Sequence, residues 1–236
     1  MLLEQVAVLL LGGKGERFSS TTPKQFITMG QTPLFIYAAK ALEASKKITK
    51  IVYVYPDGYL DLTKNLLAQY GLSKKPCLFV LGGDSRQESC FLGLSKLKKD
   101  GLSDDSLVII LDGDRPNLTQ RYIDDNLANA LEFGASVTAI KSSDSVAISK
   151  IPALIDGYIP RNEVYLLQTP QAFRFSLLFE AEEEAKKTGK KYTDEGSLVL
   201  ALRKVAPRIV EGDKANIKIT VPEDLNFFLG GKDNDQ

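Results

Sequence analysis

Histidine is absent from the 236 residues of this sequence. This absence excludes His-dependent catalytic triads, histidine-ligated metal sites and imidazole general bases. Any chemistry must therefore use carboxylates, lysines, arginines, hydroxyls and backbone amides.

Cysteine is scarce as well, since only Cys77 and Cys90 occur, and their spacing fits neither a disulfide framework nor a metal site. We expect both to be reduced, which favours a cytoplasmic protein. Long hydrophobic runs are also missing. The longest, Val6 to Leu11, is too short to span a bilayer, and the first residues lack the layout of a signal peptide.

The chain has no excess of charge of either sign, because 30 lysines and arginines balance 30 aspartates and glutamates. No global electrostatic field points to nucleic acid or to a membrane as a partner, so any anion must be bound locally. The composition, 44% hydrophobic and 25% charged, is that of an ordinary globular protein. We expect a single domain over residues 1–229, followed by a disordered tail over 230–236.

Short apolar runs rich in β-branched residues alternate with longer segments of helical spacing. Strands are expected at 6–11, 50–55, 76–81, 107–111 and 135–140, and helices at 33–45, 58–71, 86–99, 119–132 and near 175–187. This order predicts an α/β fold with a mostly parallel, buried sheet. A final pair of strands is expected near 208–212 and 216–220.

The loops that follow three of these strands are unusual. They read GGKGERFSSTTPKQ from residue 12, GGDSR from residue 82 and DGDRP from residue 112. Ligands of such sheets bind outside the carboxyl ends of the strands. Glycine and aspartate alone would indicate turns, but three loops at one edge that also carry arginine favour a binding site.

The first loop suits a polyphosphate. Its glycines and cations are Gly12, Gly13, Gly15, Arg17 and Lys24. Glycines let backbone N–H groups surround oxyanions, and the two cations add full positive charges. The dinucleotide fingerprint does not fit because Phe18 stands where its last glycine should be, and the P-loop does not fit because Lys14 is followed by glycine. This layout is typical of a nucleotidyltransferase.

Six motifs, in order, make the resemblance specific: "GGKGERF…PKQF", "GGDSRQES", "DGDRP", "IPRNEVYLLQTPQAF", "TDEGS" and "NIKITVPEDL". Over about residues 5–228 the sequence resembles the 2-C-methyl-D-erythritol 4-phosphate cytidylyltransferases of the non-mevalonate isoprenoid pathway. The resemblance implies a three-layer, Rossmann-like (GT-A-like) nucleotidyltransferase fold. It also implies transfer of a cytidylyl group from CTP to the sugar-alcohol phosphate, with release of pyrophosphate. Ribitol-5-phosphate cytidylyltransferases share nearly the same motifs and remain the alternative.

The family's functional residues can be carried over position by position. The catalytic cations implied are Arg17, Lys24 and Lys218. The residues implied to bind CTP are Leu11, Gly12, Gly13, Gly15, Gly83, Asp84, Ser89 and Asp112. Those implied to bind the acceptor are Arg115, Ser145, Arg161, Thr169, Thr193 and Asp194. Mg²⁺ is the cofactor implied, held by Asp112 or through the CTP phosphates.

Residues 142–165 interrupt the strand–helix pattern with short runs and two prolines, which indicates a β-hairpin arm. In the family this arm crosses to a twofold-related subunit. The resemblance therefore implies a homodimer in which Ser145 and Arg161 serve the neighbour's site. An isolated hairpin has no core of its own, which gives a physical reason for such pairing.

Some positions depart from the family pattern. Leu111 stands where histidine is usual, Asp114 replaces a small residue, and Ala215 stands where aspartate is frequent. In the arm, Ser145 and Ala147 occupy positions where threonine and lysine are common. Asp114 should weaken anion binding unless it helps to hold the metal. The CTP half of the site is thus nearly intact, whereas the sugar-phosphate half is altered.

Two further interpretations compete with this one, the first also an enzyme and the second from another class. The tripeptide "DGD" at 112–114 resembles the D-x-D metal motif of nucleotide-sugar glycosyltransferases, but those enzymes do not need the first loop. The chain could also be a catalytically silent nucleotide-binding module. The presence of both Arg17 and Lys24 disfavours that view, because a sensor needs no charges aimed at a leaving group.

Overall fold

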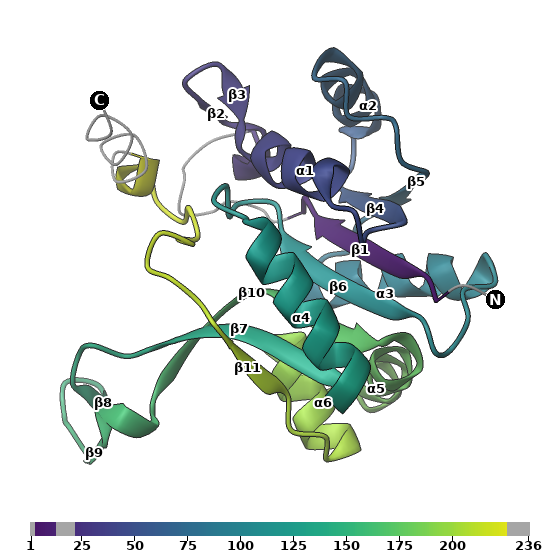
Figure 1. The fold of residues 1–236 in the computed structure, drawn as a ribbon. Coiled ribbons are helices and arrows are strands. Elements are labelled where there is room, and N and C mark those ends of the chain that lie inside the picture. Colours follow the sequence, from purple (N-terminus) through teal and green to yellow (C-terminus); the bar gives the residue numbers. More distant parts are fainter. Residues whose placement is uncertain (1–2, 13–21, 226–236) are drawn as a thin grey trace.

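A seven-stranded sheet forms the centre of the computed structural model, which describes residues 3–12 and 22–225 (Figure 1). Its strand order is β11-β7-β10-β6-β1-β4-β5. The strands are β1 Gln5–Leu10, β4 Lys50–Tyr55, β5 Cys77–Leu81, β6 Leu107–Asp112, β7 Ala135–Lys141, β10 Tyr165–Arg174 and β11 Arg208–Glu211. Within this sheet β10 is antiparallel to both its neighbours, and the remaining pairs are parallel. The mostly parallel sheet expected from the sequence is confirmed.

Helices cover both faces of the sheet and make it the middle of three layers (Figure 1). Along β1, Ala7 and Leu9 pack towards α1, α2 and α4, whereas Val6 and Val8 pack towards α3, α5 and α6. The helices are α1 Leu34–Ala44, α2 Leu60–Gln69, α3 Arg86–Lys99, α4 Gln120–Phe133, α5 Phe175–Thr188 and α6 Glu195–Arg203. Both faces of the strand are apolar because both are covered.

Two expectations about strands need correction. Residues 216–220 are not a strand, because their backbone groups bond to loops and side chains instead: Ile219 N–H donates to the Asp114 carbonyl over 2.9 Å. The strand β10 was not expected, because its first half is rich in buried polar residues such as Gln168 and Thr169. It inserts between β6 and β7, and β11 pairs with β7 rather than with 216–220.

Beyond β7 the chain leaves the sheet and forms a small hairpin, β8 Val146–Ile148 paired with β9 Gly157–Ile159 (Figure 1). Large apolar side chains gather on it: Ile151, Leu154, Ile155 and Tyr158 are 57%, 59%, 60% and 72% exposed. The remaining short elements are β2 Thr28–Met29, β3 Thr32–Pro33 and the 3₁₀ turns Lys24–Phe26 and Arg161–Glu163. None of the helices in the described ranges is both long and apolar enough to cross a membrane.

Candidate active site

Two adjoining clefts lie at the carboxyl edge of the parallel strands. The larger, about 650 Å³, is lined among others by Gly12, Gly83, Asp84 and Ser89, all of which the resemblance assigns to CTP. The smaller, about 230 Å³, holds most of the residues assigned to the acceptor, namely Arg115, Thr169, Thr193 and Asp194, together with Asp112 and Lys218. Arg86 lines both clefts. The structure therefore brings the two predicted groups of residues together as neighbours.

The start of α3 shapes the larger cleft. The Ser85 hydroxyl caps the helix by accepting from Glu88 N–H over 3.1 Å, and Glu88 Oε2 accepts from Asp84 N–H over 2.9 Å. A Cβ at Gly83 would lie only 2.3 Å from Glu88 Cγ, so glycine lets that side chain fold back. The buried Ser89 hydroxyl accepts from Gly83 N–H over 3.1 Å. The Gly83 and Asp84 N–H groups are thus bonded to Ser89 and Glu88, so this end of the cleft is better suited to the neutral base of a nucleotide than to a phosphate group.

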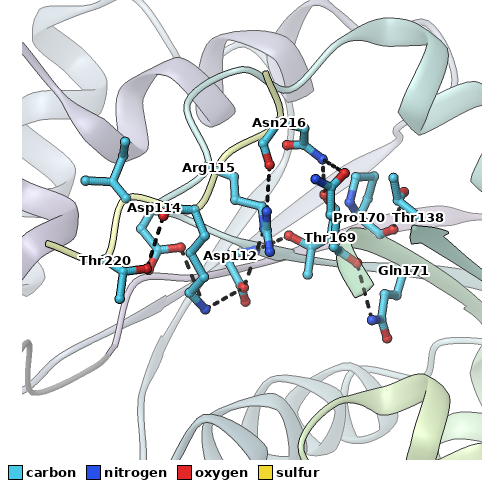
Figure 2. Close-up of polar contacts among 12 residues, drawn as sticks. Asp112, Asp114, Arg115, Thr138, Thr169, Pro170, Gln171, Asn216 and Thr220 are labelled. Carbon is cyan, nitrogen blue, oxygen red and sulfur yellow. Dashed lines mark hydrogen bonds and ion pairs between the residues drawn. The ribbon is translucent and has the colours of Figure 1, made fainter. Parts of the chain in front are cut away.

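Asp112, at the end of β6, lines the smaller cleft, and its polar contacts are drawn in Figure 2. Arg86 Nε lies 2.9 Å from Asp112 Oδ1, and Lys218 Nζ lies 2.8 Å from Oδ2. Burial alone would raise the pKa of the Asp112 carboxyl, but Arg86 and Lys218 outweigh it and hold that pKa well below its usual range. Asp112 is thus an anion that fixes two cations where the two clefts adjoin. We call this region, with Lys24, Arg86, Asp112, Asp114 and Lys218, the mouth of the sheet.

Arg86 was expected to belong to a ligand-binding loop, but the sequence interpretation assigned it no role of its own. It also donates to Glu195 Oε1 over 2.7 Å, so it links α3, β6 and α6. Burial alone would lower the pKa of Arg86, but the carboxylates of Glu195 and Asp112 raise that pKa by more and keep the guanidinium charged. The signal was present, because Arg86 stands directly after GGDS and Glu195 stands within TDEGS.

Lys24, one of the predicted catalytic cations, is held by an aspartate. Its Nζ lies 2.6 Å from Asp114 Oδ2 and donates to the Ile219 carbonyl over 3.0 Å. Both side chains are nearly buried, with exposed fractions of 11% for Lys24 and 3% for Asp114. The extra negative charge expected at 114 is therefore paired with Lys24.

Arg115 and Asn216 fasten the 216–220 segment to the site (Figure 2). Arg115 Nη1 donates to the Asn216 carbonyl over 2.6 Å, and Asn216 Nδ2 donates to the Thr169 carbonyl over 2.9 Å. Thr169 in turn accepts from Asp112 N–H through its hydroxyl, over 3.2 Å. Burial lowers the pKa of Arg115, which Asp112 and Asp114 partly offset. These bonds set the position from which Lys218 reaches Asp112.

Several predicted residues lie elsewhere or serve the fold as well. Ser145 and Arg161 are exposed, on or beside the hairpin, and line neither cleft. Leu11 is fully buried in the core, which leaves its backbone for any contact with a ligand. Asp194 caps α6 by accepting from Ser197 N–H over 2.9 Å. Gly13, Gly15, Arg17 and the tail 230–236 lie outside the described residues.

The acidic side chains of the mouth suit a hard cation. Asp114 Oδ1 is buried and has no hydrogen-bond partner among the described residues, and Asp112, two positions earlier, ends β6. Mg²⁺ takes oxygen ligands and commonly shares them with substrate phosphates. A second group, made of Cys90, Glu182 and Glu195, is buried beyond Arg86. Its thiol makes that group a poor match for Mg²⁺.

Known proteins match this chain over nearly its whole length. The family model of the 2-C-methyl-D-erythritol 4-phosphate cytidylyltransferases (IspD) matches residues 5–228. The enzyme of that name from Thermosipho melanesiensis is 38% identical over 226 residues, which cover 95% of this chain and 96% of the relative. The one from Geobacillus thermodenitrificans is 36% identical over 222 residues, covering 94% and 93%.

A solved structure agrees with these sequence matches. The crystal structure of 4-diphosphocytidyl-2C-methyl-D-erythritol synthase from Anaerococcus prevotii superposes with a TM-score of 0.84 and 27% identity, covering 98% of this chain and 97% of that one. The fold, the order of the motifs and the sequence matches lead to one conclusion. The chain belongs to the 2-C-methyl-D-erythritol 4-phosphate cytidylyltransferase family.

Proposed function

We propose that this protein transfers a cytidylyl group from CTP to 2-C-methyl-D-erythritol 4-phosphate in isoprenoid precursor biosynthesis. One observation carries the proposal: Arg86 and Lys218 converge on Asp112 where the two clefts meet. Transfer of a group between two substrates requires the reacting phosphates to meet where the two binding clefts adjoin. The family membership supports the identities of the two substrates.

The reaction is an in-line displacement at the α-phosphorus of CTP. An oxygen of the acceptor phosphate forms the new P–O bond, the bond to the β-phosphate breaks, and pyrophosphate leaves with the electron pair. A phosphate dianion is already nucleophilic at neutral pH, so no general base is needed, which accords with the absence of histidine. Negative charge grows on the equatorial oxygens and on pyrophosphate, so fixed cations stabilise the transition state more than the ground state.

In this proposal the cations of the mouth stabilise the negative charge that grows on the reacting phosphates. Lys218 is fixed by Asp112, and of its three ammonium protons one is used in that pair. Arg86 stands between the clefts, in reach of both substrates. Arg17, Lys24 and the glycines of the first loop complete the triphosphate site in this proposal. Gly83, Asp84 and Ser89 hold the cytosine end.

Mg²⁺ is the proposed cofactor, and Asp112 would hold it together with the CTP phosphates. When bound, it neutralises part of the triphosphate charge.

The acceptor is proposed to be bound, from the same chain, by Arg115, Thr169, Thr193 and Asp194. A cytoplasmic location is proposed as well, because Cys77 and Cys90 are both unpaired.

The arm is proposed to make a homodimer and to bring Ser145 and Arg161 to the neighbour's smaller cleft. The support is physical. Its large side chains Ile151, Leu154, Ile155 and Tyr158 are exposed within the single chain, and a second copy would cover them. A C₂ dimer would place two arms symmetrically, one for each site.

Pyrophosphate release with CTP and Mg²⁺ tests the proposal, with methylerythritol 4-phosphate and ribitol 5-phosphate in separate reactions. Release with the first acceptor alone is expected. Preference for ribitol 5-phosphate would overturn the proposed acceptor and retain the nucleotide chemistry. CTP binding without release from either acceptor would overturn the transferase proposal for both.

A further inference from the structure

Both the side chain and the backbone of Asp114 contact residues of the predicted catalytic site. Its side chain pairs with Lys24 over 2.6 Å, and its carbonyl accepts from Ile219 N–H over 2.9 Å. Lys24 donates back to the Ile219 carbonyl over 3.0 Å. Asp114, Lys24 and Ile219 thus form a closed ring of contacts, which we call the Asp114 clasp.

The loop that carries Asp114 is tightly packed against β1. A Cβ at Gly113 would lie 2.8 Å from Leu11 Cδ2 and 3.0 Å from the Leu10 carbonyl, so glycine lets the loop lie against the end of β1. The Gly113 N–H also donates to the Leu10 carbonyl over 2.9 Å. Asp114 is consequently held beside Lys24 and has little room to turn away.

The clasp joins the two predicted catalytic lysines. Ile219 follows Lys218 directly, so Lys24 holds the backbone next to the residue that reaches Asp112. Lys218 Nζ also lies 4.0 Å from Asp114 Oδ1. Loss of the clasp would therefore loosen both lysines at once.

The contacts of Asp114 position Lys24, but its negative charge weakens the binding of a phosphate by that lysine. Two of the three Lys24 ammonium protons are used by Asp114 and Ile219, which leaves one for a phosphate. The adjacent carboxylate cancels much of the attraction of Lys24 for a polyanion. Asp114 thus fixes the position of Lys24 and at the same time reduces the affinity of the site for the triphosphate.

We propose that Asp114 is a positioning residue that fixes Lys24 and the 216–220 segment for phosphoryl transfer while it limits the affinity for CTP. The inference rests on the proposed function. It assigns to Asp114 a role other than ligation of the metal, and it makes two separable effects measurable, one geometric and one electrostatic.

Two substitutions separate these effects. Asp114→Asn keeps an oxygen for Lys24 and removes the charge, so the Kd and KM for CTP with Mg²⁺ should fall about 5- to 10-fold while kcat stays within about 3-fold. Asp114→Ala removes the clasp, so kcat should fall by about 10- to 100-fold. Asp105→Asn, an exposed site before β6 at the opposite edge of the sheet, makes the same charge change and should alter neither constant.

A third readout needs no nucleotide. Acetylation of Lys24 by acetic anhydride, followed by peptide mass analysis, should be slow in the wild type and in Asp114→Asn, and several-fold faster in Asp114→Ala. This readout keeps the clasp testable if the wild type releases no pyrophosphate with either acceptor, an outcome that would overturn the proposed function alone.

Either of two results would overturn the inference. Equal weakening of CTP binding by both substitutions, restored by higher Mg²⁺ concentration, would make Asp114 a metal ligand. Unchanged kinetic constants with unchanged acetylation of Lys24 would mean that the clasp neither positions the lysine nor restrains it.

Discussion

The mouth of the sheet and the arm differ in how their polar residues are held. At the mouth, Lys24, Arg86 and Lys218 are each paired with a partly or fully buried carboxylate. On or beside the arm, Ser145 and Arg161 are exposed, and the arm also carries large exposed apolar side chains. Among the described residues, one chain thus holds the cations of the mouth in place by itself. The polar residues of the arm have no such buried partners in the clefts, which accords with the proposal that the arm serves a second copy.

The difference follows from sequence separation. Lys24 and Ile219 are 195 positions apart, and Arg86 and Glu195 are 109 apart. The carboxyl edge of a parallel sheet gathers such distant loops, and the core fixes them. The hairpin, in contrast, is stabilised by local pairing between β8 and β9. Small hairpins are marginal alone, and a partner surface, as in the proposed dimer, would stabilise the arm.

Removal of a cation from the mouth should have the largest effect. Lys218→Ala takes away the ammonium that Asp112 fixes where the reacting phosphates are proposed to lie. We expect kcat to fall roughly 10²- to 10³-fold, because a fixed charge aimed at the transition state is lost. Lys214→Ala, on the same segment but exposed, is the matched control and should retain wild-type rates. Equal losses in both variants would show that the segment, rather than the ammonium, is what matters.

Mixing two impaired variants should show whether the arm belongs to the neighbouring site. Lys218→Ala and Arg161→Ala are each expected to lower the rate at least about tenfold. If the arm crosses a twofold axis, the mixed dimer has one site with both residues intact. Half of the dimers are mixed and half of their sites are intact, so the refolded mixture should recover roughly a quarter of wild-type activity. Activity no higher than the average of the two variants would contradict an arm that serves its neighbour.

Behind the mouth, a buried acidic group connected to it through Arg86 and Glu195 should make stability depend on pH. Glu182 lies beside Glu195 and Cys90, and within residues 3–12 and 22–225 its Oε1 has no hydrogen-bond partner. Burial, and then the charge of Glu195, raise the pKa of Glu182 from 4.5 to about 8. Between these values the folded state keeps a proton that the unfolded state has released. Stability should therefore decrease as pH rises through this range, by at most about 1.4 kcal/mol per pH unit.

Glu182→Gln tests this dependence because an amide cannot ionise. Its free energy of unfolding in urea should decrease less between pH 6 and pH 8.5 than that of the wild type. Glu183→Gln changes the adjacent, less buried carboxyl and should follow the wild type. A wild-type protein that is as stable at pH 8.5 as at pH 6 would show that Glu182 is not protonated in the folded state.

Much of the mouth could be predicted from the sequence, because its motifs directly follow apolar strands and such loops meet at one edge. The pairing of Arg86 with Glu195 could not, since the two residues share no local pattern. Residues 216–220 were predicted as a strand because Ile217 and Ile219 alternate with polar residues. Their backbone groups bond instead to Arg115, Asp114 and Lys24, and such side-chain and loop partners are invisible to strand propensity.

The smallest effect is expected from a methyl group on the arm. Ser145→Thr restores the residue type common at this position in the family, and the added methyl both restricts χ1 and adds apolar contact. Burial of one such group changes affinity by at most about fourfold, so the KM for methylerythritol 4-phosphate should fall by no more than that. The KM for CTP should stay constant, and Ser143→Thr, exposed on the same stretch, should change neither. A larger change in the KM for CTP than for the acceptor would place Ser145 with the nucleotide and break the division between mouth and arm.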